Sequence, residues 1–446
     1  MMAATHLLRQ VTLIDGTGRP PLENAVVVFR DGRILYAGSA EGWSASAQSQ
    51  AAGARAQGAD DPDETLALDL PGQFVLPGLI DLHVHLAMDG AADSRLQGDL
   101  AWTTLLMLAH ARSSLAAGVT TLRDVGGRFG LEFVVRRAIE SGLYIGPRMV
   151  LSGKLLSITS AGTEYYDGMY READGPEEVR KATREQIKAG ADWIKVLATG
   201  AVLTPGEAPG AVQFGLDELQ MAVSEAANAG RPVAAHAHGI QGIRNAVAAG
   251  VRTIEHGTYL HRDPRVMETM AERGIYLVPT LKAGFDVIMG DRPGMPDWIV
   301  EKSREVQADA LLSVRRALEM GVPIAMGTDA ATPYNFHGEN AMELVWMAEA
   351  GLSPMQCIVA ATANAARALG WEDSLGTLEA GKVADLIVCA ANPLNNLRSL
   401  ADRANITLVF KDGRIVARQP ALNEGDIPEE MLAGGWICCG LPVREG

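Results

Sequence analysis

Two histidines separated by one residue, His83 and His85, end the apolar run Pro77 to Leu82. Successive side chains in a β-strand point to opposite faces, so the two imidazoles should share a face, roughly 7 Å apart along the strand. Imidazole is a common metal ligand, and two on one face can bind one ion. The pair could also be two polar residues at a strand end. A metal site therefore needs further ligands from elsewhere in the chain.

Four more polar residues fall at or near the carboxyl ends of predicted strands. Lys195 lies within the apolar run Trp193 to Leu197, and the others are His236, His256 and Asp329. A single histidine in an apolar strand is most often a core residue with satisfied hydrogen bonds. That explanation does not account for six such residues together, which favours a shared site.

Lys195 is the most informative of the six. An ammonium inside a buried strand is costly unless it is paired, and a salt bridge to a buried acid is one solution. Beside residues that bind cations, however, an ammonium would repel a metal ion. Carbamylation by carbon dioxide would convert it into a carboxylate with two oxygens that can bridge two ions. Burial also lowers the pKa of the lysine and so favours the neutral amine that reacts.

Strands and helices alternate from Leu79 onward and would position these side chains. The predicted helices cover 98–117, 176–189, 215–229, 240–249 and 298–320, followed by a helical pair at 337–350 and 354–369. The eight predicted strands cover 79–85, 119–124, 148–152, 193–198, 232–238, 252–256, 275–280 and 322–328. Eight such units predict an α/β fold, the TIM (β/α)8 barrel, whose active site lies at the carboxyl ends of the strands.

Both ends of the chain show the pattern of short strands joined by tight turns. Asp31-Gly32 and Asp412-Gly413 separate apolar runs, which is typical of β-hairpins. We therefore expect a small β-sandwich domain formed from residues 1–76 and 376–446, the latter with a tail, around a catalytic barrel at 77–375. The Ala-, Ser-, Gln- and Gly-rich stretch at 39–63 is predicted to be an excursion from that domain.

Composition limits the partners and the compartment. A formal charge of −15 disfavours nucleic acid and anionic membranes. Apolar runs do not reach the ~18 residues of a membrane span and the N-terminus lacks a signal-peptide pattern, so we expect a cytoplasmic protein. The four cysteines agree with a reducing compartment. Two of them, the adjacent pair Cys438 and Cys439, are interpreted as part of a tail rather than as a metal site.

Taken together, these motifs resemble the metal-dependent amidohydrolase superfamily, in the subset with two metals and a carboxylated lysine. The resemblance covers roughly residues 5–420. Ala198-Thr199-Gly200 and His256-Gly257-Thr258-Tyr259 are similar to the branch of Xaa-Pro and other dipeptide carboxypeptidases, ochratoxin hydrolases and, more distantly, imidazolonepropionase. The motifs that carry the resemblance are Pro77 to His85, Thr121 to Gly127, Ile194-Lys195-Val196, His236 to Gly239, Glu255-His256-Gly257, Gly327 to Ala330 and Gly381 to Val388.

The resemblance implies a ligand set for two divalent ions, expected to be zinc. His83, His85 and Asp329 would hold one ion, His236 and His256 the other, and carboxylated Lys195 would bridge them. His238 shares a strand face with His236 and could replace it as the ligand. The residues expected near the substrate are Tyr259, Tyr165, His238 and His337, although Tyr259 could simply pack a loop and His337 could be an ordinary residue at a helix start.

One departure from the branch concerns the loop after the third strand. Relatives often carry a histidine there that can polarise the scissile carbonyl, but residues 152–170 contain none. The loop does contain Tyr165 and Tyr166. Either a tyrosine hydroxyl takes that role or the substrate class differs.

The expected reaction is hydrolysis of an amide bond with an amino-acid leaving group. A metal-bridged hydroxide would attack the carbonyl, with Asp329 as general base and then general acid. The substrate would be a dipeptide of the Xaa-Pro type, an N-acyl amino acid or an ochratoxin. Alternatives are a cyclic amide, carbamate, lactone or phosphotriester on the same binuclear site, and a non-catalytic scaffold. A single-metal deaminase would have no use for Lys195. The partner is a small-molecule substrate, and the resemblance implies a homo-oligomer, with an octamer as one form.

Overall fold

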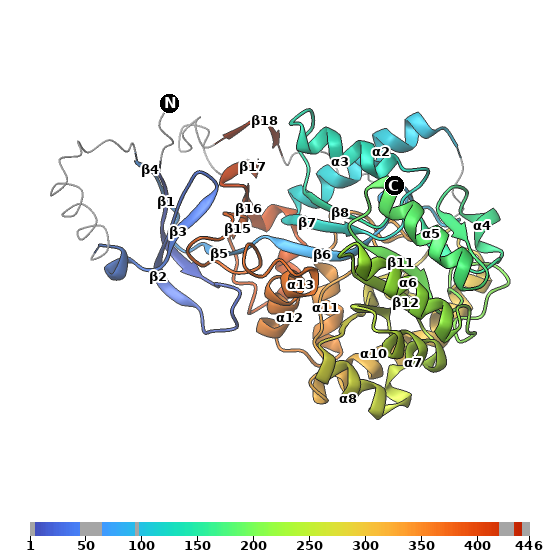
Figure 1. The fold of residues 1–446 in the computed structure, drawn as a ribbon. Helices are drawn as coiled ribbons and strands as arrows, with labels where there is room; N and C mark the ends of the chain where they lie inside the picture. Colours follow the sequence, from blue (N-terminus) through green and yellow to red (C-terminus); the bar gives the residue numbers. More distant parts are fainter. Residues whose placement is uncertain (1–4, 45–64, 94–97, 419–431, 439–446) are drawn as a thin grey trace. The chain divides into compact units, whose positions relative to one another are not determined.

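The computed structural model describes residues 5–44, 65–93, 98–418 and 432–438 (Figure 1). The chain divides into two compact units. One comprises Met1–Ile80, Ser114–Thr120 and Pro354–Gly446, and the other comprises Asp81–Ser113 and Thr121–Ser353. The helices α12 (Pro354–Ala360) and α13 (Ala363–Leu369) therefore belong with the strands of the chain ends. The domain bounds expected from the sequence, at 76 and 375, remain predictions.

The first unit contains a nine-stranded sheet to which both ends of the chain contribute. Its order is β18-β17-β16-β15-β5-β1-β2-β3, with β4 also paired to β1. The antiparallel pair of β5 and β15 joins the two halves. The strands are β1 (Thr5–Leu13), β2 (Leu22–Arg30), β3 (Arg33–Ser39), β4 (Thr65–Asp69), β5 (Phe74–Pro77), β15 (Leu386–Cys389), β16 (Ile406–Lys411), β17 (Arg414–Arg418) and β18 (Leu432–Cys438).

This sheet differs from the predicted sandwich because it is continuous. Phe29 in β2 and Phe410 in β16 have three strands between them in the sheet order, yet their ring centroids are 5.4 Å apart. The sheet must therefore curl around one shared core. The hairpin turns are as predicted, since Asp31, Gly32, Asp412 and Gly413 all have positive φ, as a type I′ turn requires. Most of the predicted excursion at 39–63, and Cys439 of the tail, lie outside the described residues.

The second unit is built on parallel strands. One sheet has the order β6-β7-β8 and another the order β10-β9-β11-β12-β13-β14. Seven of the eight predicted strands correspond to these. The strands are β6 (Leu79–Val84), β7 (Val119–Asp124), β8 (Arg148–Leu151), β9 (Leu155–Ser157), β10 (Tyr170–Glu172), β11 (Ile194–Leu197), β12 (Val233–Ala237), β13 (Thr253–His256) and β14 (Tyr276–Val278).

The eighth predicted strand, at 322–328, is represented by isolated bridges. Ile324 bridges to Leu277 in β14, and Ala330 bridges to Val84 in β6, both in parallel. The backbone N–H of Leu82 also donates to the carbonyl of Met326 at 3.0 Å. The segment therefore runs between β14 and β6, and it brings Asp329 to the end of β6.

Helices follow the strands, and in Figure 1 α5, α6, α7 and α10 lie around the parallel strands of this unit. The bounds predicted for α5 are confirmed: Pro176 is its first residue, Glu177 and Glu178 lie in its first turn, and Gly190 ends it with φ 101°. The helices are α2 (Leu100–Ala116), α3 (Leu131–Glu140), α4 (Gly162–Tyr165), α5 (Pro176–Ala189), α6 (Leu216–Asn228), α7 (Ile240–Ala249), η1 (Leu260–Arg262), α8 (Pro264–Arg273), α9 (Leu281–Ile288), α10 (Asp297–Glu319) and α11 (Met342–Glu349).

One predicted helix starts later than expected. The sequence predicts a helix from His337, but α11 begins only at Met342. Asn340 explains the delay, because its side chain donates to Asp81 and accepts from the backbone N–H of Gly338. Among the described residues, the structure contains no helix that is long and apolar enough to cross a membrane.

Candidate metal centre

The first group of donors is His83, His85 and Asp329. Their candidate ligand atoms lie within 4.8 Å of one another, and all three side chains are buried. Oδ1 of Asp329 is 3.4 Å from Nε2 of His83 and 3.2 Å from Nε2 of His85. Two imidazole nitrogens and one carboxylate oxygen facing one point suit a divalent ion such as zinc.

A buried carboxylate, that of Glu255, contacts the Nδ1 side of the His83 ring. Nδ1 of His83 lies 2.8 Å from Glu255, whose other oxygen accepts from Arg123 at 2.8 Å and from the Thr253 hydroxyl. Burial alone would raise the pKa of Glu255, but Arg123, His83 and Lys195 outweigh burial and lower that pKa. The ionised carboxylate can only accept, so His83 carries its proton on Nδ1 and presents the Nε2 lone pair to the site.

Asp81 joins the end of β6 to the segment that carries Asp329. One oxygen accepts from the backbone N–H groups of His83 and Thr328, at 3.1 Å each. The other accepts from the Thr328 hydroxyl and the Asn340 side chain, at 2.7 Å each. Asp329 itself has φ 58°, in the left-handed region that residues other than glycine rarely adopt. These hydrogen bonds fix the preceding residue and so hold Asp329 in that conformation.

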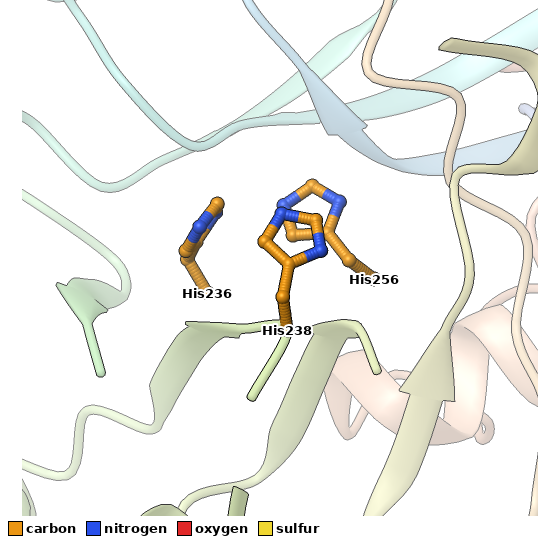
Figure 2. A group of neighbouring side chains, drawn as sticks. All are labelled: His236, His238 and His256. Carbon is orange, nitrogen blue, oxygen red and sulfur yellow. The ribbon is translucent and has the colours of Figure 1, made fainter. Parts of the chain in front are cut away.

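The second group is His236, His238 and His256, from the ends of β12 and β13. Figure 2 shows the three rings gathered together, and their centroids are 4.5 to 4.7 Å apart. Nδ1 of His238 lies 2.7 Å from the Thr258 hydroxyl, and Nδ1 of His256 lies 2.7 Å from the Thr280 hydroxyl. Burial is the largest cause that lowers the pKa of all three histidines, so each is a neutral imidazole. The structure brings both His236 and His238 into the group.

Lys195 lies in β11 and lines the same cavity as both donor groups. Its side chain is 1% exposed, and its Nζ has no hydrogen-bond partner among the described residues. Burial lowers its pKa to about 8. An unpartnered ammonium in this place is costly, whereas a carboxylated lysine would be a further metal ligand. The residues present therefore fit the two divalent metal ions that the sequence motifs imply.

The cavity over the two groups has a volume of about 120 Å³, roughly ten times the minimum that one water needs. Its floor is polar and its walls are largely apolar. The lining includes Met88, Leu155, Tyr166, Met169, Tyr170, Leu197, Leu203, Val287, Val306 and Ala310. Such a site can hold a small apolar group beside the two donor groups.

Three of the residues expected near the substrate do not line this cavity. Tyr165 is buried and donates its hydroxyl to Asp93 at 2.7 Å. The ring of Tyr259 packs under the guanidinium of Arg262, at 3.9 Å. His337 is buried and stacks on His110, with ring centroids 4.6 Å apart. Of the four residues expected there, only His238 lines the cavity, so substrate contacts of the other three remain predictions.

Sequence reasoning missed the residues that support the ligands. Glu255 and Arg123 each lie within a motif that carries the resemblance, but the two are distant in sequence, so their pairing is not visible there. Arg123 is fully buried, donates from Nε to the carbonyl of Leu82 at 2.6 Å and lies 4.4 Å from the ring centroid of Trp193. The available signal was one buried charge in each of two apolar strands, which suggests a buried ion pair.

Parallel strands whose carboxyl ends bring two groups of metal donors to one cavity are typical of metal-binding hydrolases. The chain belongs to the Amidohydrolase family, whose sequence pattern matches residues 74–416. It is 32% identical to ochratoxinase from Aspergillus niger over 434 residues, which cover 90% of this chain and 85% of that protein. It is 27% identical to an imidazolonepropionase from Rhizorhabdus wittichii, over 87% of this chain and 94% of that protein.

Solved structures with a similar fold include proteins of the same kind. A Xaa-Pro dipeptidase with bound methionine in the active site superposes with a TM-score of 0.80 at 33% identity, over 92% of this chain and 99% of that chain. The A. niger ochratoxinase structure gives a TM-score of 0.79 at 30% identity, over 95% and 98%. The chain is therefore a hydrolytic enzyme that acts on C–N bonds, which sets aside the scaffold alternative. The family is generally metal-dependent, and both histidine groups could bind metal.

Proposed function

We propose that this enzyme hydrolyses an amide bond whose leaving group is an amino acid. The substrate would be a dipeptide of the Xaa-Pro type, an N-acyl amino acid or an ochratoxin. The observation that carries the proposal is the buried, unpartnered Nζ of Lys195 in the cavity that both donor groups line. The ochratoxinase and Xaa-Pro dipeptidase relatives support the choice of bond.

The proposed ligand set is that of the sequence motifs. His83, His85 and Asp329 would hold one divalent ion, and His236 and His256 the other, with His238 as the alternative ligand. Carboxylated Lys195 would bridge the two ions. Zinc suits these nitrogen and oxygen donors. When bound, the two ions would supply a water activated at neutral pH and a Lewis acid for the scissile carbonyl.

Asp329 is placed to move the proton in this reaction. Burial alone would raise its pKa, but His83, His85 and Lys195 outweigh burial and lower that pKa, so the carboxylate is ionised. It would accept the proton of the attacking water and then pass it to the amine nitrogen that leaves. The left-handed backbone at Asp329 fixes where this carboxylate points.

One observation favours a second candidate. Among the described residues of the cavity lining, Lys195 is the only lysine or arginine. The carboxylate of an amino-acid leaving group therefore has no free basic side chain there to pair with. A neutral cyclic amide, carbamate, lactone or phosphotriester would not need one.

The test is a panel of substrates assayed with the zinc-loaded enzyme. Dipeptides such as Ala-Pro and Met-Pro, together with N-benzoyl amino acids, would be compared with neutral carbamates, lactones and phosphotriesters of similar size. We expect kcat/KM to be highest for the first class. Hydrolysis confined to the neutral compounds would replace the first candidate with the second.

Three wider features are proposed with it. We propose that the strands close into an eight-stranded barrel, supported by the segment between β14 and β6 and by the hydrogen bond from Asp192 N–H to the carbonyl of Leu151 at 2.8 Å. The cytoplasmic location and the homo-oligomer, with an octamer as one form, are also proposals. Small-angle scattering and mass photometry would measure the oligomer.

A further inference from the structure

Helix α10 forms one wall of the cavity. Four of its residues face the cavity at the i, i+3, i+4 and i+7 spacing of one helix face, namely Ser303, Val306, Gln307 and Ala310. All four side chains are buried. Gln307 is the only amide among them, in a wall that also includes the apolar Leu203 and Val287.

The amide of Gln307 has a polar atom with no protein partner. Its side chain is 7% exposed, and Nε2 has no hydrogen-bond partner in the described part of the chain. Leaving such a donor buried and unsatisfied is unfavourable, so it calls for a reason. In the same lining, Nζ of Lys195 and Nδ1 of His85 share this state but belong to the proposed metal ligands, and the Thr204 hydroxyl interacts with Tyr170. Of these unsatisfied polar atoms in the described cavity lining, Nε2 of Gln307 is the one that neither explanation covers.

Gly284 in α9 makes room for this amide. A Cβ at Gly284 would lie 1.8 Å from Oε1 of Gln307, so only glycine allows the amide to occupy its place. Glycine inside a helix is less favourable than alanine. The position therefore carries a residue that disfavours the helix but leaves space for the polar group, which is a second observation at this amide.

The surroundings indicate the chemistry of that ligand. A carboxylate beside Gln307 would be buried without a basic partner, because the only lysine or arginine of the described lining is Lys195. A neutral oxygen acceptor satisfies the amide N–H at no such cost. The apolar neighbours on α9 and α10 suit an aromatic or aliphatic group around that oxygen.

We propose that Gln307 is a specificity-determining residue whose amide N–H donates to a neutral carbonyl or ether oxygen on an apolar part of the substrate. This inference rests on the proposed function for the identity of the substrate, but not for the contact itself. Gly284 acts through Gln307 by leaving space for its amide.

Binding of two small neutral probes tests the contact without turnover. Acetophenone and α-methylstyrene have the same shape and differ in one carbonyl oxygen. Their dissociation constants would be measured by ligand-observed NMR on the zinc-loaded wild type and on Gln307→Leu. We expect the preference for acetophenone to fall by about five- to tenfold in the variant, as for loss of one hydrogen bond. An unchanged ratio would overturn the proposal.

A matched pair of substrates extends the test to the reaction. The pair is N-(4-acetylbenzoyl)-L-phenylalanine and N-(4-isopropenylbenzoyl)-L-phenylalanine, compared by kcat/KM. We expect the ratio to fall by about fivefold in Gln307→Leu and in Gly284→Ala, whose new Cβ displaces the amide. Gln220→Leu, at an exposed position of α6, is the control and should keep the wild-type ratio.

The two measurements separate the inference from the proposed function. If neither compound is hydrolysed while the probe ratio still falls in Gln307→Leu, the proposed function is wrong and the contact stands. If both compounds are hydrolysed and neither ratio changes in the variants, the contact is wrong and the proposed function stands.

Discussion

The two donor groups of the candidate centre differ in what supports their histidines. In the first group, His83 is backed by the ionised Glu255, and Asp329 adds a carboxylate of its own. In the second group, His238 and His256 are backed by the neutral hydroxyls of Thr258 and Thr280. The first group therefore carries negative charge without modification, and the second carries none.

This difference predicts unequal affinity for metal. A carboxylate behind a ligand histidine fixes its tautomer and raises its basicity, and an anionic ligand attracts a cation directly. A threonine hydroxyl fixes the ring orientation but supplies no charge. We infer that the first group binds its ion more tightly, and that the second depends on carboxylated Lys195 for its only negative ligand.

The largest expected effect is that of Lys195→Ala. Removal of the proposed shared ligand should lower kcat/KM on the order of a thousandfold or more, as when one member of a catalytic set is deleted. The metal content should fall from two ions to one per chain, because the second group keeps only neutral ligands. Metal analysis and kinetic assays measure both results, and short carboxylic acids should restore part of the activity. A fully active variant with two ions would refute the bridging role.

Glu255→Gln should mainly weaken the first group. We expect affinity for the ion there to fall by about 10- to 100-fold, the usual effect of removing a carboxylate behind a ligand histidine. Calorimetric titration of the metal-free protein with zinc measures it. Glu319→Gln, an exposed glutamate on α10, is the matched control.

Glu255→Gln also leaves Arg123 as a buried cation without its anion, which destabilises the folded protein. The double variant Arg123→Met and Glu255→Gln removes that charge, and its melting temperature shows whether the fold is kept. If the folded double variant binds zinc as the wild type does, Glu255 has no role in supporting the ligand.

Limited chelation tests the order of affinity in the unmodified enzyme. Dialysis against increasing concentrations of a chelator should remove the two ions in separate steps, with affinities that differ by about tenfold or more. The ion lost first should be the one bound by His236 and His256. One cobalt ion added to the half-depleted protein should then bind at this second group, and its absorption spectrum should report the ligands there. Loss of both ions in one step would mean that the two groups are equivalent.

The candidate metal donors could be predicted from the sequence more readily than the residues that hydrogen-bond to them. His83, His85, Lys195, His236, His256 and Asp329 stand out because a polar residue in an apolar strand is visible in one dimension. Glu255 and Arg123 are equally polar, but the sequence does not show that they pair across two strands or that one of them touches His83. The same limit applies to Gln307, because its cavity arises only when α10 packs beside the strand ends.

The smallest expected effect concerns the threonines of the second group. Thr280→Val keeps the size of the side chain and removes the hydroxyl that lies 2.7 Å from Nδ1 of His256. The imidazole then loses one neutral hydrogen bond, so zinc affinity of the second group should fall only about three- to tenfold. Thr269→Val, at a half-buried position of α8, is the control for the substitution itself. If Thr280→Val cost as much affinity as Glu255→Gln, charge would not be what distinguishes the two groups.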